Sequence, residues 1–195
     1  MKHALACRCG RVRGHVILPT IAARAVCYCK DCQAYARFLG QEAAVLDAQG
    51  GSDIVATMPS HLRFEQGLDA LACLSLTPKG ILRWYASCCA TPIGNTPPDR
   101  KVHYVGLVHS CLAKPLEPAF GPARVRLNTA SATGPVQGTP VAMGLAILKL
   151  MRFMLPARFT ARHRDNPFFE ADSGRPIVAR RVLTPAELAA VKTVA

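Results

Sequence analysis

Polar and apolar side chains alternate along residues 61–65, which is typical of a strand with one buried face. Residues 72–76 and 81–85 have the same extended character. Pro78 and Gly80 between them favour a tight turn, so we expect a hairpin. Further short apolar runs bounded by glycine or proline predict strands at residues 15–18, 53–58 and 102–108. The first part of the chain is therefore predicted to be mainly β.

Two local signals modify this β pattern. Residues 90–98 contain three prolines and a glycine, and we expect no regular strand there. Residues 33–39 favour a helical turn directly after a cysteine-rich loop.

Beyond about residue 110 the pattern changes. Residues 113–140 are rich in Pro, Gly, Ala and Thr, so we expect a long connection with one strand at residues 123–127. Residues 141–155 are apolar almost all round, which predicts a helix that Pro156 ends. Such a helix is shorter than the roughly 20 residues that a bilayer requires, so we expect no transmembrane segment. We expect it to be buried in the core, with a membrane surface or a dimer interface as the alternatives.

A second helix is predicted at residues 185–192. Thr184 and Glu187 have the spacing of a capping box, and a proline follows the cap at the first helical position. We therefore divide the chain into a β domain, residues 1–110, and a C-terminal extension, residues 111–195, that contains one or two helices.

Composition and charge narrow the class of protein. Half of the 195 residues are hydrophobic, enough for a folded core, which excludes a chain disordered throughout. The formal net charge of +12 would attract nucleic acid, anionic lipid or a small anionic substrate, although a merely Arg-rich surface gives the same count. Nine cysteines, with no apolar stretch before the first that could form a signal peptide, argue against a complete disulfide framework. We therefore expect a cytoplasmic protein with metal-bound cysteines, and a homo-oligomer is left open.

The densest chemical signal is the segment that holds Cys27, Cys29 and Cys32. Its combined C-x-C and C-x-x-C spacing lets three thiolates meet at one Zn²⁺ and leaves a fourth position open, as in catalytic zinc sites. A C-x-C pair is also too short for a relaxed disulfide. The alternatives are buried free thiols or a redox pair of Cys29 and Cys32, although the βαβ pattern expected around such a pair is missing.

A second, closed zinc site is predicted from distant parts of the chain. Cys7 and Cys9 lie upstream, and Cys88 and Cys89 follow the predicted hairpin. Because consecutive side chains diverge in extended backbone, we expect that one of the last two could suffice.

Four further residues have simpler interpretations. Cys73 and Cys111 stand among apolar residues and are predicted to fill the core. His103 and His109 could each supply a nitrogen ligand, but exposed or hydrogen-bonded histidines are the simpler expectation.

Taken in order, the cysteine motifs resemble those of the glutathione-dependent formaldehyde-activating enzyme (GFA-like) family, which includes centromere protein V. The motifs are Cys7-Arg8-Cys9-Gly10, Cys27-Tyr28-Cys29-Lys30-Asp31-Cys32-Gln33 and Cys89-Ala90-Thr91-Pro92-Ile93. The resemblance covers about residues 3–108 and implies a compact, zinc-stapled β fold. It further implies a catalytic zinc held by the triple-cysteine segment and a structural zinc held by Cys7, Cys9 and Cys89.

One motif departs from the family pattern, in which the later motif is Cys-x-x-Cys-Gly-Thr. Ala86 stands where its first cysteine is expected, and Ala90 replaces the glycine. Either Cys88 substitutes as the fourth ligand, or the structural site is incomplete.

The resemblance implies a zinc-dependent carbon–sulfur lyase or synthase that acts on a thiol adduct of a small carbonyl, similar to S-hydroxymethylglutathione. Asp31 and His15 are conceivable proton carriers. Lys30, Arg37 or Arg24 could offset the negative charge of three thiolates around the ion.

The alternative function is a non-catalytic, zinc-stabilised module that binds nucleic acid or another anionic partner. The basic excess and the Arg-rich residues 158–164 and 175–181 motivate it. An aromatic content of 6% gives little support for base stacking on single strands.

Overall fold

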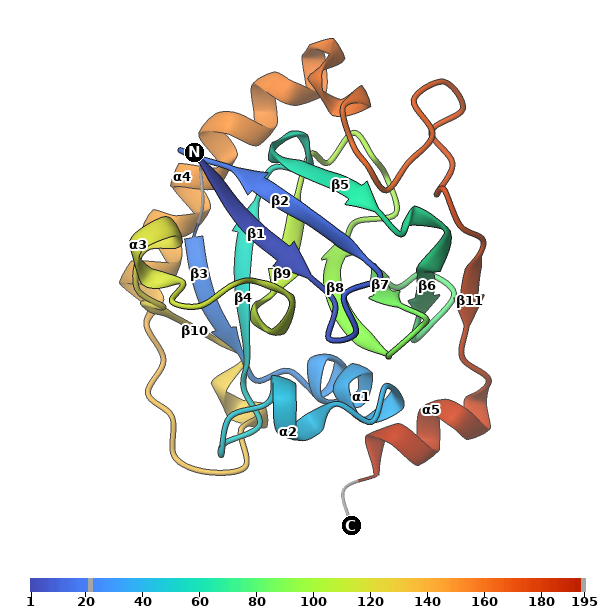
Figure 1. Ribbon diagram of the computed structural model, residues 1–195. Coiled ribbons are helices and arrows are strands. Elements are labelled where there is room, and N and C mark those ends of the chain that lie inside the picture. The colour runs from blue at the N-terminus through green and yellow to red at the C-terminus, as the bar shows by residue number, and fades with distance from the viewer. Residues whose placement is uncertain (21–22, 194–195) are drawn as a thin grey trace.

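The structure, a computed structural model, describes residues 1–20 and 23–193, and these residues form a mainly β protein with eleven strands in two sheets (Figure 1). The smaller sheet has the order β1-β2-β5, with β1 at Lys2–Ala6, β2 at Arg13–Ile17 and β5 at Leu62–Gln66. The larger sheet has the order β10-β3-β4-β9-β8-β7-β6-β11. Its strands are β10 Val125–Leu127, β3 Ala23–Cys27, β4 Ser52–Thr57, β9 Val105–Val108, β8 Thr91–Thr96, β7 Leu82–Ala86, β6 Leu71–Ser75 and β11 Arg180–Val182. The prediction of a mainly β chain is confirmed.

The main core lies between the two sheets. Trp84 of β7 is fully buried, and its ring lies 4.9 Å from that of Phe168. Leu62 and Val16 of the smaller sheet belong to the same buried cluster. Because side chains alternate along a strand, β7 directs Trp84 into this core and Arg83 to the other face of the large sheet. Arg83 lines a cavity on that other face.

The predicted hairpin is confirmed as β6 and β7, which pair antiparallel with Cys73 opposite Trp84. The expectation that residues 90–98 form no regular strand is wrong, because β8 runs through them at the centre of the sheet. Its pairing with β7 shifts register between Trp84 and Tyr85, beside Pro92, and its pairing with β9 is confined to Gly94 and Asn95. The irregularity places the proline where its missing N–H is tolerated.

Helices cover the ends and one side of the large sheet (Figure 1). They are α1 Lys30–Phe38, α2 Glu42–Val45, α3 Glu117–Phe120, α4 Pro140–Phe159 and α5 Pro185–Lys192. Short 3₁₀ turns lie at Pro59–His61, Leu68–Ala70, His109–Cys111, Thr129–Ser131 and Ala161–Arg164. The second predicted helix is confirmed as α5, whose capping box is formed by Thr184 and Glu187.

The segment after residue 110 is built into the large sheet. β10, within the predicted strand at residues 123–127, pairs parallel with β3, and β11 pairs parallel with β6. The extension therefore supplies both edge strands of the sheet that carries the triple-cysteine segment. The pairing of β10 with β3 places Leu127 beside Cys27 of the triple-cysteine segment.

Helix α4 differs from its prediction in length and in surroundings. It continues through Pro156 to Phe159, although the proline lacks the N–H that would bond to the carbonyl of Arg152 four residues earlier. The expectation that it is buried in the core is wrong: Val141 is 76% exposed and Leu148 62%. By length and composition, Pro140–Ala157 is the one described helix that could cross a membrane, which is weak evidence by itself.

Candidate metal centres

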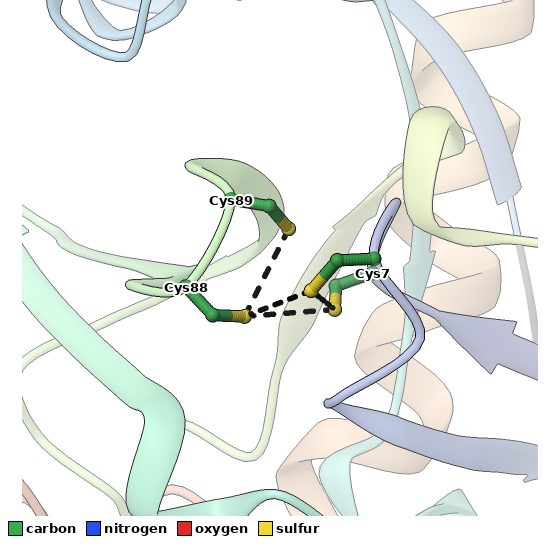
Figure 2. Close-up of side chains that lie close together, drawn as sticks. Cys7, Cys88 and Cys89 are labelled. Carbon is green, nitrogen blue, oxygen red and sulfur yellow. Dashed lines mark hydrogen bonds between the residues drawn. The ribbon is translucent and has the colours of Figure 1, made fainter.

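The first candidate centre joins two loops that are far apart in the sequence. Cys7 and Cys9 lie in the loop between β1 and β2, and Cys88 and Cys89 lie in the turn after β7. Figure 2 shows the sulfur atoms of Cys7, Cys88 and Cys89 facing one another, and together with that of Cys9 they lie within 4.8 Å of each other. We refer to these residues as the four-cysteine cluster.

The sulfur spacing fits a tetrahedral ion. The Sγ distances are 3.5 Å for Cys7–Cys9, 3.8 Å for Cys7–Cys88, 3.3 Å for Cys9–Cys88 and 3.9 Å for Cys88–Cys89. Four sulfurs at 2.3 Å from a zinc ion would be about 3.8 Å apart. All four positions of such an ion would be taken by protein, so the cluster fits a closed centre.

A tight turn lets the consecutive cysteines converge. Residues 87–90 form this turn, and the left-handed backbone of Ala90 (φ 55°) completes it. The expectation that the side chains of Cys88 and Cys89 diverge assumed an extended backbone, and here both sulfurs reach the cluster. Cys88 thus brings a fourth sulfur to the cluster, while Ala90 adopts a left-handed conformation that glycine would favour.

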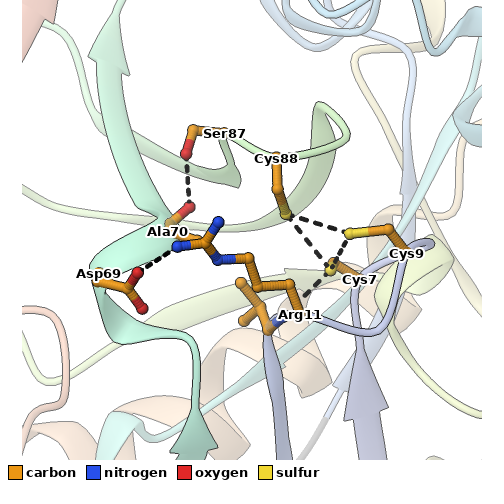
Figure 3. Close-up of polar contacts among 8 residues, drawn as sticks. Cys7, Cys9, Arg11, Asp69, Ala70, Ser87 and Cys88 are labelled. Atoms are coloured by element: carbon orange, nitrogen blue, oxygen red, sulfur yellow. Dashed lines mark hydrogen bonds and ion pairs between the residues drawn. The ribbon is translucent and has the colours of Figure 1, made fainter.

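Hydrogen bonds hold the two loops around the cluster. The Val12 amide donates to Cys7 Sγ at 3.3 Å, and the Arg8 amide donates to Thr91 Oγ1 at 3.0 Å, which joins the loops directly. Beside Cys88, Arg11 pairs with Asp69 at 2.5 Å, which lowers the pKa of that carboxyl (Figure 3). These contacts therefore help to hold the loops in place alongside the sulfur atoms.

The second candidate centre is the triple-cysteine cluster, Cys27, Cys29 and Cys32. Cys27 ends β3, Cys29 is the N-cap of α1, and Cys32 lies in its first turn. Their sulfur atoms lie within 4.8 Å of one another. The Cys32 amide donates to Cys29 Sγ at 3.3 Å, so the helix N-terminus stabilises negative charge on that sulfur. The predicted convergence of the three sulfurs is thus present.

Cys27 has the strongest thiolate character in this cluster. Hydrogen bonds from Cys29 and Cys32 lower its pKa to about 2, against the opposing effect of burial. Asn128 Nδ2, from the C-terminal extension, donates to Cys27 Sγ at 3.3 Å and contributes to this lowering of the pKa. No local pattern in the sequence connects Asn128 with this cysteine 101 residues away.

A cavity of about 610 Å³ distinguishes the two clusters. Cys27, Cys29 and Cys32 all line it, whereas, among the described residues of the four-cysteine cluster, only Cys7 and Cys9 line a cavity, a separate one of about 410 Å³. A metal ion held by the triple-cysteine cluster would keep a coordination position that substrate could reach through this cavity.

Arg83 is a functional candidate that sequence reasoning missed. It is 2% exposed, lines the cavity and donates to Asn95 Oδ1 at 3.3 Å, while its Nε has no hydrogen-bond partner among the described residues. Its charge favours the thiolate of Cys32, although hydrogen bonds to Cys27 and Cys29 hold the pKa of Cys32 high. The sequence signal for Arg83 was its position between Leu82 and Trp84 in a predicted strand. Because side chains alternate along a strand, Arg83 points to the face of the sheet opposite to that of these two core residues.

The basic residues that we expected to offset the thiolate charge have other partners. Arg24 pairs with Asp53 at 2.5 Å, and Arg37 lies 3.6 Å from Glu42. Neither lines the cavity in the described part of the chain, and neither does Lys30.

The two residues that we expected as proton carriers differ in their position relative to the cavity. His15 Nδ1 lies 2.9 Å from Glu65 in the small sheet and does not line the cavity. Asp31 does line it and pairs with Lys192 of α5 at 3.1 Å.

The simpler interpretations of the remaining cysteines and histidines hold. Cys73 and Cys111 are buried core residues, and burial raises the pKa of the Cys73 thiol to about 12. His103 Nε2 lies 2.9 Å from Ser60 Oγ, and His109 Nδ1 lies 3.3 Å from the Asp53 carbonyl. Within the described residues, neither histidine joins a potential metal cluster.

Fold and side chains together define a mainly β protein with two cysteine clusters that could each hold a metal ion. The chain belongs to a family of unknown function (DUF6151), whose model matches residues 2–180. Comparison with curated proteins finds no match. Among solved structures, it is similar to a crystal structure of a Rhodobacter sphaeroides protein at 17% identity and a TM-score of 0.43. That match covers 64% of this chain and 99% of the other.

Proposed function

We propose that this chain is a zinc-binding protein of the GFA-like type whose triple-cysteine cluster forms or cleaves a carbon–sulfur bond. Its substrate would be a thiol adduct of a small carbonyl compound, of the kind that S-hydroxymethylglutathione exemplifies. The observation that carries the proposal is the separation of two clusters, one with four sulfurs and one with three that face a cavity. The order of the cysteine motifs in the sequence supports the same class.

A zinc ion bound by three thiolates would supply a coordination position that favours the thiolate form of a bound thiol. In the forward direction, the thiol sulfur forms a bond to the carbonyl carbon, the carbonyl π electrons move to oxygen, and the thiol proton ends on that oxygen. In reverse, the hydroxyl loses its proton, the carbon–sulfur bond breaks, and thiol and carbonyl are released. No oxidant or reductant is needed.

The chain's own residues would hold the reacting groups. The unpartnered Nε of Arg83 could donate to the carbonyl or alkoxide oxygen, where negative charge develops. Tyr104 also lines the cavity, and burial raises its pKa to about 12, so its hydroxyl stays protonated and can donate a hydrogen bond. Asn128 would hold Cys27 in its ligating orientation.

Metal content and adduct formation test the proposal together. Elemental analysis of purified protein should give two zinc ions per chain, and Cys32→Ser should give one. With ¹³C-formaldehyde and glutathione, NMR should show that the zinc-loaded protein accelerates exchange between the free thiol and its hydroxymethyl adduct. Cys73→Ser, a buried cysteine outside both clusters, is the matched control and should retain both ions and the activity. Exchange at the uncatalysed rate would exclude carbon–sulfur chemistry on this pair of substrates.

A second candidate function is binding to nucleic acid. Residues 140–164 contain no acidic residue, and Arg162 and Arg164 at their end are exposed. Such a surface would bind phosphates with an affinity that falls steeply with salt. A fluorescence-anisotropy titration with a short DNA duplex at 50 and at 200 mM salt distinguishes this function, since a lack of salt-dependent affinity argues against it.

A further inference from the structure

The floor of the cavity is a strip of small side chains that begins at the triple-cysteine cluster. Cys27, Ala25 and Ala23 lie on the same face of β3, and the strand rise of about 3.3 Å per residue carries this strip about 13 Å away from Cys27. Ala23 pairs with Ala56 of β4, and Ala25 pairs with Ile54. The alanines leave room above the sheet where larger side chains would fill it.

The opposite wall is one face of α4. Met143, Ala146, Ile147 and Leu150 line the cavity, and their spacing of three and four residues places them on the same side of the helix. Leu127 of β10 lies between this helix and the cysteines in the wall. The cavity is therefore apolar on its floor and on its facing wall.

The polar groups of the cavity lie beside the cysteines, except Lys79, which lines it from the turn between β6 and β7. Asp31 is next to Cys32 in the chain, and the charge of Arg83 acts on Cys32, while Asn95 is hydrogen bonded to Arg83. Along β3, beyond Cys27, the floor offers methyl and methylene groups instead. A ligand that fills the cavity would thus need a reactive polar end and an apolar remainder.

We propose that the substrate of the triple-cysteine cluster carries an unbranched apolar chain, which lies along β3 beneath α4. The reaction at the substrate's sulfur rests on the proposed function, whereas the binding of its alkyl chain in the cavity does not. The two charged arms of a tripeptide thiol such as glutathione would find few hydrogen-bond partners over this floor, so an alkyl thiol or its carbonyl adduct is the better fit. The volume is within the range of small-molecule sites.

Two ligand series measured by calorimetry on the zinc-loaded full-length protein test this. The thiols are ethanethiol, butanethiol and hexanethiol, and the alcohols are ethanol, butanol and hexanol. Each buried methylene should tighten binding about fourfold in both series. Thiols should also bind more tightly than alcohols of equal length, because only they offer sulfur to the metal.

A variant that narrows the cavity supplies the second arm. Ala146→Trp should place an indole over the floor and abolish the gain between ethanethiol and hexanethiol, while leaving ethanethiol affinity nearly unchanged. Leu148→Trp lies on the same helix but on its exposed side and is the matched control, with wild-type affinities expected. Circular dichroism should show that both variants are folded.

The outcomes separate the two proposals. The apolar-chain inference would be overturned if thiol affinity did not change with chain length. It would also be overturned if Leu148→Trp, like Ala146→Trp, lost the increase in affinity from ethanethiol to hexanethiol. Either result would leave the proposed function standing. Alcohols that gain affinity with length, alongside thiols that bind no better than alcohols, would support the apolar chain and contradict the proposed function.

Discussion

The Sγ atoms of Cys9 and Cys88 lie 3.3 Å apart although 79 residues separate them in the chain. Cys9 belongs to the loop between two strands of the small sheet, and Cys88 to the turn that follows β7 of the large sheet. An ion shared by these sulfurs would join the two sheets beside the core that they enclose. We therefore expect the four-cysteine cluster to stabilise the fold and the triple-cysteine cluster to carry out the proposed reaction.

The first prediction concerns the role of the four-cysteine cluster in stability. Cys88→Ser should lower the zinc content by one ion per chain and reduce the free energy of unfolding by about 4 kcal/mol, because folding is coupled to metal binding. Urea unfolding and elemental analysis of the same preparations measure both effects.

The matched control for this prediction is Cys111→Ala, which removes a buried thiol from the core without touching either cluster. It should lose some stability and keep both ions. If Cys88→Ser also keeps two ions, Cys88 is not a ligand and the cluster binds through three sulfurs at most.

The second prediction concerns Asn128, which donates to Cys27 Sγ from the C-terminal extension. Its backbone is left-handed (φ 56°), so glycine can replace it without strain. Asn128→Gly should weaken zinc binding at the triple-cysteine cluster about 10- to 100-fold, as loss of a hydrogen bond to a ligand usually does. Competition with a chromophoric chelator measures this affinity, and the affinity of the four-cysteine cluster should not change. An unchanged affinity at both clusters would show that the hydrogen bond is dispensable.

The sequence predicts both cysteine clusters because ligand spacing is a local property. Cys27, Cys29 and Cys32 fall within six residues, where a strand end and a helix start can bring them together in few ways. The hairpin that delivers Cys88 is also local, since Pro78 and Gly80 mark its turn. These parts of the fold depend on neighbours in the chain.

The parts that could not be predicted depend on distant partners. β8 contains Pro92 and still forms a central strand, because a register shift in its pairing with β7 accommodates the proline. Arg83 and Asn128 reach the site through strand alternation and through the pairing of β10 with β3. Helix α4 is exposed because it covers a cavity instead of joining the core, and its apolar composition alone fits either arrangement.

The third prediction concerns the turn that brings Cys88 and Cys89 together. Ala90 holds a left-handed conformation (φ 55°), which costs an alanine about 1 kcal/mol and glycine almost nothing. Ala90→Gly should therefore raise the unfolding free energy by up to about 1 kcal/mol, despite the greater freedom of glycine in the unfolded chain. Ala34→Gly, in the interior of α1, is the matched control and should lower it by about 2 kcal/mol, because it loses a buried methyl group as well as helix propensity. A loss of stability in both variants would mean that the left-handed turn at residue 90 is not strained.

The last prediction concerns the pH dependence of stability through His103, which is 2% exposed. Burial lowers its pKa from 6.5 to about 4, and His163, His61 and Arg162 add to this effect while Asp165 opposes it. Between these two pH values the unfolded chain binds more protons than the folded one. Stability should therefore be complete above pH 6.5 and fall as the pH is lowered towards 4, by about 3 kcal/mol at most.

The variant His103→Gln isolates this effect, because glutamine can keep a hydrogen bond to Ser60 and does not titrate. Guanidinium unfolding of both proteins at pH 7.5, 6.5, 5.5 and 4.5 should show that the wild type loses more stability than the variant, with the difference growing below pH 6.5. Metal release at low pH affects both proteins alike and cancels in this difference. Parallel stability curves across the four pH values would mean that His103 is protonated as readily in the folded protein as in the unfolded chain.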